Sequence, residues 1–274
     1  MVTPAAVQPI LEADGLVFAY PEAAPLIRGV SLSVAPGEVA GLCGPNGSGK
    51  TTLLRLLSGR LRAGAGTVRL VGRAVSELSR PEVARLVGVV SQNGHVGFPF
   101  SALEVVLMGR AARSRKLFDT EADLIAAREA MELTETLDLA EAPFGHLSGG
   151  QRQRVLIARA LAQTSGDGPR LLLLDEPAAF LDLKHQLGMC ELLWRLAAER
   201  GLAVLAVWHD LDLAARFCHR LLLLHEGRLV AVGKPAEVLT PATLEAVFGV
   251  TVSVSPDPAT GSLRVSPLGR GPVT

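Results

Sequence analysis

The chain has 274 residues, of which 49% are hydrophobic, so it can form one large domain or two modest ones with a sizeable core. Lysine and arginine together number 27, as do aspartate and glutamate, and the formal net charge is zero. This balance argues against nucleic acid as a partner, because nucleic-acid-binding proteins usually carry a basic excess. A near-neutral, apolar chain has little charge repulsion, which favours association with other subunits.

The cysteines and the apolar runs narrow the class of protein further. Cys43, Cys190 and Cys218 are scattered and lack the spacing of a metal site or a disulfide framework, which indicates a reducing compartment. Residues 1–5 lack the layout of a signal peptide, and no apolar run approaches the ~18 residues that a membrane helix needs. We therefore expect any role at a membrane to depend on a partner.

Two segments near the N-terminus, 11–20 and 26–34, alternate apolar and polar residues and are separated by Pro21 and Pro25. This pattern predicts two antiparallel strands joined by a turn. Tyr20, the only tyrosine, ends the first segment. Its ring is either an ordinary aromatic residue at a strand end or a platform for an adenine ring.

A glycine-rich stretch follows a buried strand predicted over 38–43 and precedes a helix predicted over 52–58. It fits the P-loop pattern G-x-x-x-x-G-K-[ST] and extends one residue beyond it: Gly44, Pro45, Asn46, Gly47, Ser48, Gly49, Lys50, Thr51 and Thr52. The glycines aim backbone N–H groups inward, and the helix N-terminus adds partial positive charge for a phosphate. Lys50 is expected to reach the β- and γ-phosphates, and the Thr51 hydroxyl to ligate Mg²⁺. The bare pattern also occurs by chance. If these residues form a P-loop, adenine stacking becomes the better interpretation of Tyr20.

The next segments are a strand over 66–70, a short helix over 81–85 and a buried strand over 87–90. Gln92 comes almost directly after the last of these strands. It either contacts Mg²⁺ and the attacking water or is simply a polar loop residue, and the sequence alone does not decide between the two.

Residues 93–147 begin with a glycine- and proline-rich loop and continue with helical spacing, which predicts a mostly helical insertion in an α/β chain. A helix is expected over 120–135, with Thr120 as its N-cap and Asp123 at position N3. A small basic run in this region is interpreted as a solvated loop: Arg110, Arg113, Arg115 and Lys116.

A second candidate anion site precedes the helix predicted over 155–162. Ser148, Gly149 and Gly150 stand before this helix, where a serine and free backbone N–H groups can hold a phosphate. Because the P-loop already binds one nucleotide, we expect this second site to serve a nucleotide held by another subunit.

An acidic pair follows the continuous apolar run 171–174, which predicts a central parallel strand. Asp175 and Glu176 would lie at the carboxyl end of this strand, where ligands bind in open α/β sheets. An acidic turn that caps the next helix is the alternative, but the P-loop favours the chemical interpretation. Asp175 is expected to hold Mg²⁺ through water, and Glu176 to polarise the attacking water.

The last part of the chain predicts an amphipathic helix over 184–200 and a buried strand over 203–208. His209 follows this strand and is a candidate contact of the γ-phosphate, whereas Asp210 is expected to cap the next helix. A hairpin and two short helices are predicted next: 220–224 with 228–232, 235–239 and 241–248. From residue 250 onward we expect a proline- and glycine-rich tail with one weak hairpin, and we assign no chemical role to it.

Taken in this order, residues 11–249 resemble the nucleotide-binding subunit of ATP-binding cassette (ABC) transporters. The P-loop resembles the Walker A motif, 147–154 the cassette signature, and 171–176 the Walker B motif with Glu176 as catalytic residue. Single positions match other family motifs, namely the Q-loop, the D-loop, the switch histidine and the adenine platform: Gln92, Asp182, His209 and Tyr20. Ala178 departs from the family pattern, which usually has threonine there, and no phosphate or Mg²⁺ role is assigned to it.

The resemblance implies an α/β P-loop NTPase fold, the ABC cassette, with a RecA-like core, an antiparallel β subdomain and a helical subdomain at about 93–160. The ATPase domain would span 10–249, and 250–274 would be a short tail. The resemblance also implies a homodimer that binds two ATP molecules with Mg²⁺. Each ATP would lie between the P-loop of one chain and Ser148, Gly149 and Gly150 of the other, with Asp182 close by.

Within the family, a single cassette without a membrane span resembles the subunits of bacterial importers. These act on the cytoplasmic face of the inner membrane with permease subunits and, indirectly, a periplasmic binding protein. Segments 98–110 and 181–186 resemble the iron-siderophore, haem and cobalamin importers, and 167–170, 221–227 and 239–249 look most like haemin-import ATPases. We therefore expect haem as cargo, with an iron-siderophore or cobalamin as the alternatives. Isolated histidines are set aside as iron ligands because they lack partner spacing: His95, His146, His185, His219 and His225.

Other classes that share the cassette fit the sequence less well. A structural or DNA-repair ATPase would place a long coiled coil between the P-loop and the signature, and a translation-type protein would carry a second P-loop. A non-catalytic scaffold would be expected to lack Glu176 or Lys50, and both are present. We therefore expect ATP hydrolysis, with a soluble non-transport ABC ATPase as the alternative from a different class.

Overall fold

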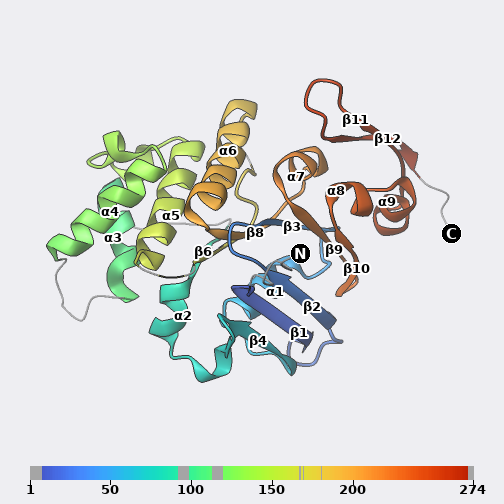
Figure 1. Cartoon of the computed structure of the whole chain (residues 1–274), viewed down its shortest axis with the longest axis horizontal. Coiled ribbons are helices and arrows are strands. Elements are labelled where there is room, and N and C mark those ends of the chain that lie inside the picture. The colour runs from blue at the N-terminus through green and yellow to red at the C-terminus, as the bar shows by residue number, and fades with distance from the viewer. Residues whose placement is uncertain are drawn as a thin grey trace, which may run out of the picture.

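The computed structural model describes residues 8–270 apart from 92–98, 113–119 and the single positions 167, 169 and 180. A four-stranded antiparallel sheet lies beside a larger six-stranded sheet (Figure 1). The antiparallel sheet has the order β2-β1-β4-β5: β1 (Leu11–Phe18), β2 (Ile27–Val34), β4 (Ala65–Leu70) and β5 (Arg73–Ala74). The predicted pairing of the first two strands is confirmed, because β1 and β2 are antiparallel neighbours.

The larger sheet has the order β10-β9-β3-β8-β7-β6 and is parallel except for its outermost strand, β10. Its strands are β3 (Val39–Cys43), β6 (Val87–Val90), β7 (Leu171–Leu174), β8 (Ala203–Val207), β9 (Arg220–His225) and β10 (Arg228–Gly233). Strand β7, second from one edge of the sheet, consists of four leucines and is fully buried, as a parallel strand covered on both faces must be.

Two hydrophobic cores lie on the two faces of this sheet, and β7 contributes to both. Leu171 and Leu173 pack into the core that the sheet shares with α1 (Lys50–Leu57) and the antiparallel sheet. Leu172 and Leu174 face the opposite core, which the remaining large helices fill. Successive side chains of a strand point to opposite faces, so one apolar run supplies both cores and fixes α1 between the two sheets.

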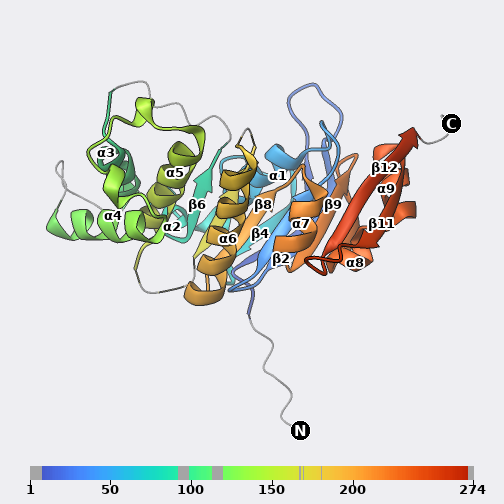
Figure 2. The same ribbon diagram turned by 90° about the horizontal axis from the view of Figure 1, so that it is seen from above.

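The helices other than α1 are α2 (Arg80–Leu86), α3 (Ala102–Leu107), α4 (Glu121–Leu133), α5 (Gly149–Thr164), α6 (Leu183–Arg200), α7 (Leu211–Phe217), α8 (Pro235–Val238) and α9 (Pro241–Phe248). Seen from above, α3, α4 and α5 gather at one end of the molecule, and α8 and α9 lie at the other (Figure 2). None of the helices in the described part of the chain has the length and hydropathy needed to cross a membrane.

Side-chain caps that the sequence predicts are present at the starts of α4 and α7. Thr120 accepts a hydrogen bond from the Asp123 backbone N–H, and the Asp123 carboxylate accepts one from the Thr120 backbone, so the predicted capping box of α4 is confirmed. The prediction of Asp210 as the cap of α7 is also confirmed, because its carboxylate accepts hydrogen bonds from the backbone of Asp212 and Leu213.

Arg110 does not lie in a solvated loop, and that interpretation is wrong for this residue. It belongs to a 3₁₀ turn, η2 (Met108–Ala112), and its side chain is only 11% exposed. Its guanidinium donates to the Asp123 carboxylate at 2.8 Å and to the Ala162 carbonyl at 2.8 Å. The run of basic residues concealed this role because the acidic partner lies on another helix. Arg113, Arg115 and Lys116 fall outside the described residues.

The C-terminal segment forms a regular hairpin of β11 (Val250–Pro256) and β12 (Leu263–Arg270), stronger than the weak hairpin expected for a tail. Val252 is buried in the main core, and the Val265 backbone N–H donates to the Asp212 carboxylate of α7 at 2.7 Å. This packing was not predicted, because local patterns do not show which elements the hairpin contacts. The alternating valines nevertheless provide one apolar face that packs on α7 and α9.

Candidate functional site

The glycine-rich loop lies between β3 and α1, as its sequence predicts. Helix α1 begins at Lys50, and its N-cap, Gly49, has a left-handed φ of 106° without a side-chain cap. Acidic residues are also missing from its first turn, so the first backbone N–H groups are available to an anion. Gly44 has a φ of 149°, and a Cβ at this position would overlap the Leu224 carbonyl oxygen. The loop therefore requires glycine where β9 passes closest to it.

Lys50 is buried inside this loop. Its ammonium donates to the carbonyl oxygens of Gly44 at 2.8 Å and Pro45 at 2.9 Å. Burial lowers the pKa of Lys50, and the nearby Glu176 carboxylate works in the opposite direction. The side chain thus spans the loop and brings positive charge to its concave side.

Thr51 and Asp175 meet at the start of α1 and the end of β7. The Thr51 hydroxyl donates to Asp175 Oδ2 at 2.9 Å, which joins two residues that are 124 positions apart in the sequence. Burial raises the pKa of Asp175, and repulsion from Glu176 adds to this effect. A carboxylate in such a place is stabilised when a cation neutralises it.

Two oxygen atoms of this site are buried and have no hydrogen-bond partner among the described residues: Ser48 Oγ and Asp175 Oδ1. Buried polar atoms in folded proteins are almost always paired, so these two atoms indicate that a polar or charged ligand completes the site. Hydroxyl and carboxylate oxygens are the ligands that Mg²⁺ prefers. The donor set around Thr51 and Asp175 therefore fits a magnesium ion, and Ser48 fits a phosphate.

Glu176 and His209 form a close pair beside the loop. His209 Nε2 lies 2.5 Å from Glu176 Oε1, and the two residues follow the neighbouring parallel strands β7 and β8. Glu176 has a φ of 56°, which is uncommon for a residue other than glycine and marks backbone strain typical of functional sites. Each residue was predicted from the sequence, but their mutual contact was not, because it depends on strand order.

A cavity of about 340 Å³ lies next to Thr51 and Asp175 and is also lined by Arg55, Arg60 and Ser91. No motif in the sequence points to the two arginines. Arg55 stands four residues after Thr51 on α1, so helical spacing alone would have placed it on the same face. Gln92, the residue after Ser91, falls outside the described residues.

Tyr20 lies beyond the end of β1, two residues later than Phe18, and the residue is 37% exposed. Its hydroxyl is 3.3 Å from the Thr52 hydroxyl, and this hydrogen bond is the main cause that lowers the pKa of Tyr20. The Phe18 ring supports it edge to face at a centroid distance of 4.9 Å. An exposed ring is thus fixed at the first turn of α1.

Ser148 is the N-cap of α5, and the helix begins at Gly149, six residues earlier than predicted. Ser148 accepts a hydrogen bond from the Gln151 backbone, and Gln151 Oε1 accepts one from the Ser148 backbone. This capping box brings two glycines into the first turn, which residue preferences disfavour. Gly150 has no Cβ, and one would lie 2.7 Å from the His185 ring, so α6 can approach closely.

Asp182 is the N-cap of α6, and its carboxylate contacts the backbone and the ring of His185 at 3.0 and 2.7 Å. Within the described residues, no hydrogen bond or ion pair connects 148–150 with the loop 44–52. The structure therefore assembles the loop, Asp175, Glu176 and His209 at one place and presents the Ser148 region separately.

This chain is similar to members of a known protein family. The ABC transporter family matches residues 27–179. The "Hemin import ATP-binding protein HmuV" of Myxococcus xanthus is 46% identical over 89% of this chain and 92% of its own length. The "Cobalamin import ATP-binding protein BtuD" of Halobacterium salinarum is 43% identical over 89% of this chain and 60% of its own length.

Solved structures share the fold over most of its length. An ABC transporter in an inward-facing conformation has a TM-score of 0.82 and 28% identity, covering 96% of this chain and 98% of the other. A dimeric bacterial ABC transporter cassette has a TM-score of 0.71 and 29% identity, covering 82% of this chain and 98% of the other. The expected cassette fold is thus confirmed, and the chain belongs to the ABC transporter family.

Proposed function

We propose that this chain is the ATP-hydrolysing subunit of a bacterial importer and that it couples hydrolysis to the passage of haem through separate membrane subunits. Membership of the ABC transporter family makes the chain an ATP-binding ATPase subunit. The observation that carries the catalytic part of the proposal is the Thr51–Asp175 hydrogen bond beside the Glu176–His209 pair.

The loop is proposed to hold the phosphates. Backbone N–H groups around Gly47 and Gly49 and the Lys50 ammonium would bind the β- and γ-phosphates, which explains why Lys50 is already directed across the loop. Thr51 and Asp175, together with Gln92, would hold Mg²⁺, which supplies charge neutralisation when bound. The exposed ring of Tyr20 would stack on adenine.

Glu176 is proposed to accept the proton of the attacking water. Its contact with His209 fixes the carboxylate, and His209 would contact the γ-phosphate from the end of the neighbouring strand. Positioning and electrostatics supply most of the acceleration in phosphoryl transfer, so a preassembled pair is what this chemistry requires.

A second copy of the chain is proposed to complete each site. Ser148, Gly149 and Gly150 would contact the nucleotide bound to the partner's loop, and Asp182 would lie at the same junction. This assembly would explain why Ser148 is placed apart from the loop of its own chain. The dimeric ABC cassette with a similar fold supports this arrangement.

The ATPase machinery is proposed to lie within 10–249. Its helical portion at about 93–160 would contact integral membrane permease subunits on the cytoplasmic face of the inner membrane. A periplasmic binding protein would deliver the cargo to the permease. Haem is favoured as cargo because the relative from Myxococcus xanthus is named as a hemin importer, and the relative from Halobacterium salinarum keeps cobalamin as the second candidate.

The cargo is tested by growth of a strain that lacks this chain, with haemin or a ferric siderophore as sole iron source and with cobalamin uptake measured in parallel. Loss of growth on haemin alone, restored by the wild-type chain but not by Lys50→Ala, is the expected result. A defect only on the siderophore or in cobalamin uptake would replace haem as cargo. Normal behaviour on all three would favour a soluble non-transport ABC ATPase.

The catalytic assignment is tested with Glu176→Gln. We expect ATP binding to persist and the rate of hydrolysis to fall by at least about 100-fold, because a neutral amide cannot accept the proton of water. A coupled phosphate-release assay measures the rate, and a fluorescent ATP analogue measures binding. Hydrolysis within a few-fold of the wild-type rate would contradict the role of Glu176.

A further inference from the structure

We propose that Glu135 is a positioning residue that sets the orientation of α5 against α6 and thereby places Ser148 for the nucleotide of the partner subunit. This inference rests on the proposed function, because it assumes that Ser148 completes a site in a second copy. Glu135 lies outside the loop, the acidic pair and the Ser148 region, and it contacts α5 and α6 from the end of α4.

The Glu135 carboxylate joins two helices, and each of its oxygens has its own arginine. Oε2 accepts a hydrogen bond from Arg154 Nη1 of α5 at 2.6 Å. Oε1 accepts one from Arg195 Nη2 of α6 at 2.9 Å. The two guanidinium groups hold the pKa of Glu135 below its ordinary value, with Arg154 as the larger cause. The carboxylate is therefore charged at neutral pH and bridges α5 and α6.

The backbone that carries Glu135 is itself fixed at the end of α4. Its neighbours Thr134 and Thr136 are completely buried, and their hydroxyls lie 3.0 Å apart in a hydrogen bond. The Thr134 hydroxyl also donates to the Ala130 carbonyl at 3.1 Å. Glu135 has a φ of 57°, a left-handed conformation that directs the chain out of the helix. The carboxylate thus extends from a rigid support.

Both arginines also contact the last carbonyls of α4. Arg154 Nη1 donates to the Thr134 carbonyl at 3.3 Å, and Arg195 Nη2 donates to the Leu133 carbonyl at 3.3 Å. Positive charge at a helix C-terminus is favourable because the carbonyls there carry partial negative charge. The end of α4 and the Glu135 carboxylate together form the junction that holds α5 and α6.

This junction lies close to Ser148 along α5. Arg154 is six residues after Ser148, which corresponds to about 9 Å along α5. Its guanidinium passes over Gly188 of α6, where a Cβ would lie 2.9 Å from Arg154 Nη2. Nearer the N-terminus of α5, Gly150 packs against the His185 ring of α6. The two helices are therefore held together at two separate points.

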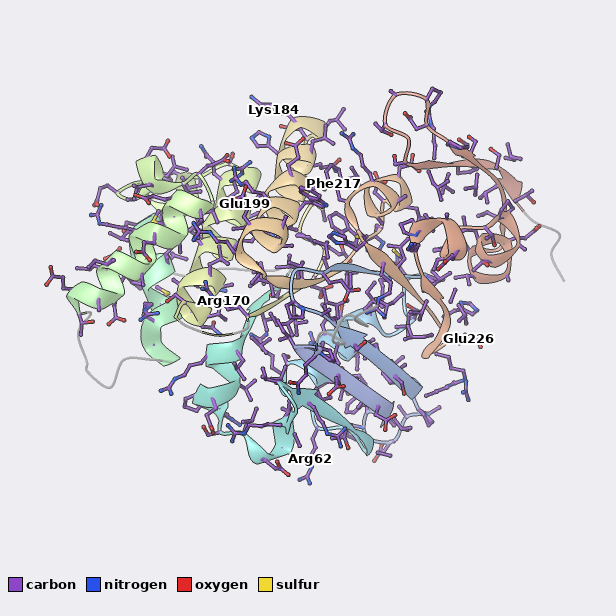
Figure 3. The ribbon with its side chains drawn as sticks, viewed as in Figure 1. Arg62, Arg170, Lys184, Glu199, Phe217 and Glu226 are labelled. Atoms are coloured by element: carbon purple, nitrogen blue, oxygen red, sulfur yellow. The ribbon has the colours of Figure 1, made fainter. Side chains whose placement is uncertain are left out.

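Helix α6 is linked in turn to the catalytic strand. The chain passes from Asp175 and Glu176 to Asp182, the N-cap of α6, within a few residues. In Figure 3, Lys184 and Glu199 lie toward opposite ends of α6. A change in the angle between α5 and α6 would therefore also move Ser148 relative to Asp175 and Glu176. The Glu135 and Arg195 side chains are 55% and 43% exposed, whereas Arg154 is only 18% exposed, so the ion pair with α5 is the better shielded from water.

The test uses the full chain with Glu176→Gln, in which ATP-bound dimers are expected to accumulate. Sedimentation measures dimerisation with ATP, and a fluorescent ATP analogue measures nucleotide binding. Adding Glu135→Gln is expected to weaken dimerisation at least tenfold and to leave nucleotide binding within twofold. Glu129→Gln is the matched control, because Glu129 is an exposed glutamate of α4 whose side chain has no hydrogen bond or ion pair with a described residue.

A kinetic readout separates positioning from general damage. With Glu176 intact, Glu135→Gln should make the ATPase rate per subunit depend more steeply on protein concentration and approach the wild-type rate at high concentration. Damage to the fold would lower the rate by the same factor at every concentration and would lower nucleotide binding with it. That second pattern would overturn the proposal for Glu135.

Arg195→Gln provides an independent variant, because it removes only the α6 side of the junction and leaves the Arg154 contact in place. Combined with Glu176→Gln, Arg195→Gln should weaken dimerisation with ATP and leave nucleotide binding unchanged. Equal dimerisation of this variant and of Glu176→Gln alone would overturn the inference while the proposed function stands. If Glu176→Gln alone does not dimerise with ATP, the composite site is wrong, and the inference is overturned with it.

Discussion

At the scale of single residues, Gly44 and Gly47 show two different reasons for glycine in one loop. Gly44 has a φ of 149°, and a Cβ there would collide with the Leu224 backbone of β9. Gly47 has a φ of 79° with nothing within 4 Å of the position of a Cβ. The first glycine allows a close approach of two chain segments, and the second only allows a left-handed turn.

The two glycines therefore predict different effects of the same substitution. Gly47→Ala should destabilise the fold by about 1–2 kcal/mol, the cost of a left-handed conformation for an L-residue. Gly44→Ala should cost more, because β3 or β9 must shift as well, and it should abolish ATP binding. Urea unfolding and binding of a fluorescent ATP analogue measure both effects. Equal losses in the two variants would contradict the assigned contact with Leu224.

At the scale of elements, the ion pair between Arg110 and Asp123 holds the helical region together. It joins η2 to the first turn of α4, and the Arg110 guanidinium also donates to the Ala162 carbonyl near the C-terminal end of α5. Burial alone would raise the pKa of Asp123. Hydrogen bonds from Thr120 and Arg110 outweigh that effect, so its pKa lies below the ordinary value. The carboxylate is charged, buried and fully engaged.

Asp123→Ala should destabilise the chain by about 3 kcal/mol, because it leaves the Arg110 charge buried without its partner. Arg73→Ala is the control, because its ion pair with Glu82 is exposed and should contribute less than about 1 kcal/mol. Urea unfolding at pH 7 measures both.

The pH dependence has a definite sign. Because the folded pKa of Asp123 is depressed, its contribution is complete above the ordinary aspartate pKa and is lost as pH falls through the folded value. The stability difference between the wild type and Asp123→Asn should therefore shrink on acidification below about pH 4. A difference that is constant with pH would contradict the charged state of Asp123.

At the scale of the whole molecule, the C-terminal hairpin connects the end of the chain to the element that follows His209. Val252 is buried in the main core, and the Val265 backbone is bonded to Asp212 in the first turn of α7. Both views place this hairpin at the end of the molecule opposite α3, α4 and α5 (Figures 1 and 2). It therefore supports the core from the side that faces away from the helical region.

A chain that ends at Gly249 should lose at least about 2 kcal/mol of stability, because the burial of Val252 and its apolar neighbours is lost. Thermal unfolding of the nucleotide-free chain measures the change. Leu268→Ser serves as the control, because Leu268 lies in the same hairpin but is 67% exposed and should leave the stability nearly unchanged. An unchanged melting temperature on truncation would show that the hairpin is dispensable.

Local patterns in the sequence were sufficient for most elements and for the position of the glycine-rich loop. The alternation of 11–20, the four leucines of β7 and the spacing G-x-x-x-x-G-K-[ST] each depend only on neighbouring residues. The same is true of the Thr120 capping box and of Asp210 as a cap. Such interactions span three or four positions, so a single sequence contains all the information they need.

Only the tertiary structure decided which distant residues meet. The Thr51–Asp175 bond, the Glu176–His209 pair and the bridge from Glu135 to α5 and α6 join residues that strand order and helix packing bring together. Arg110 was misjudged for the same reason, and the packing of the C-terminal hairpin was not predicted, because the partners of both lie elsewhere in the chain. The sequence by itself determined the elements and the position of the glycine-rich loop. The packing of those elements decided how the acidic and basic groups are paired, because long-range contacts leave no periodic trace in the chain.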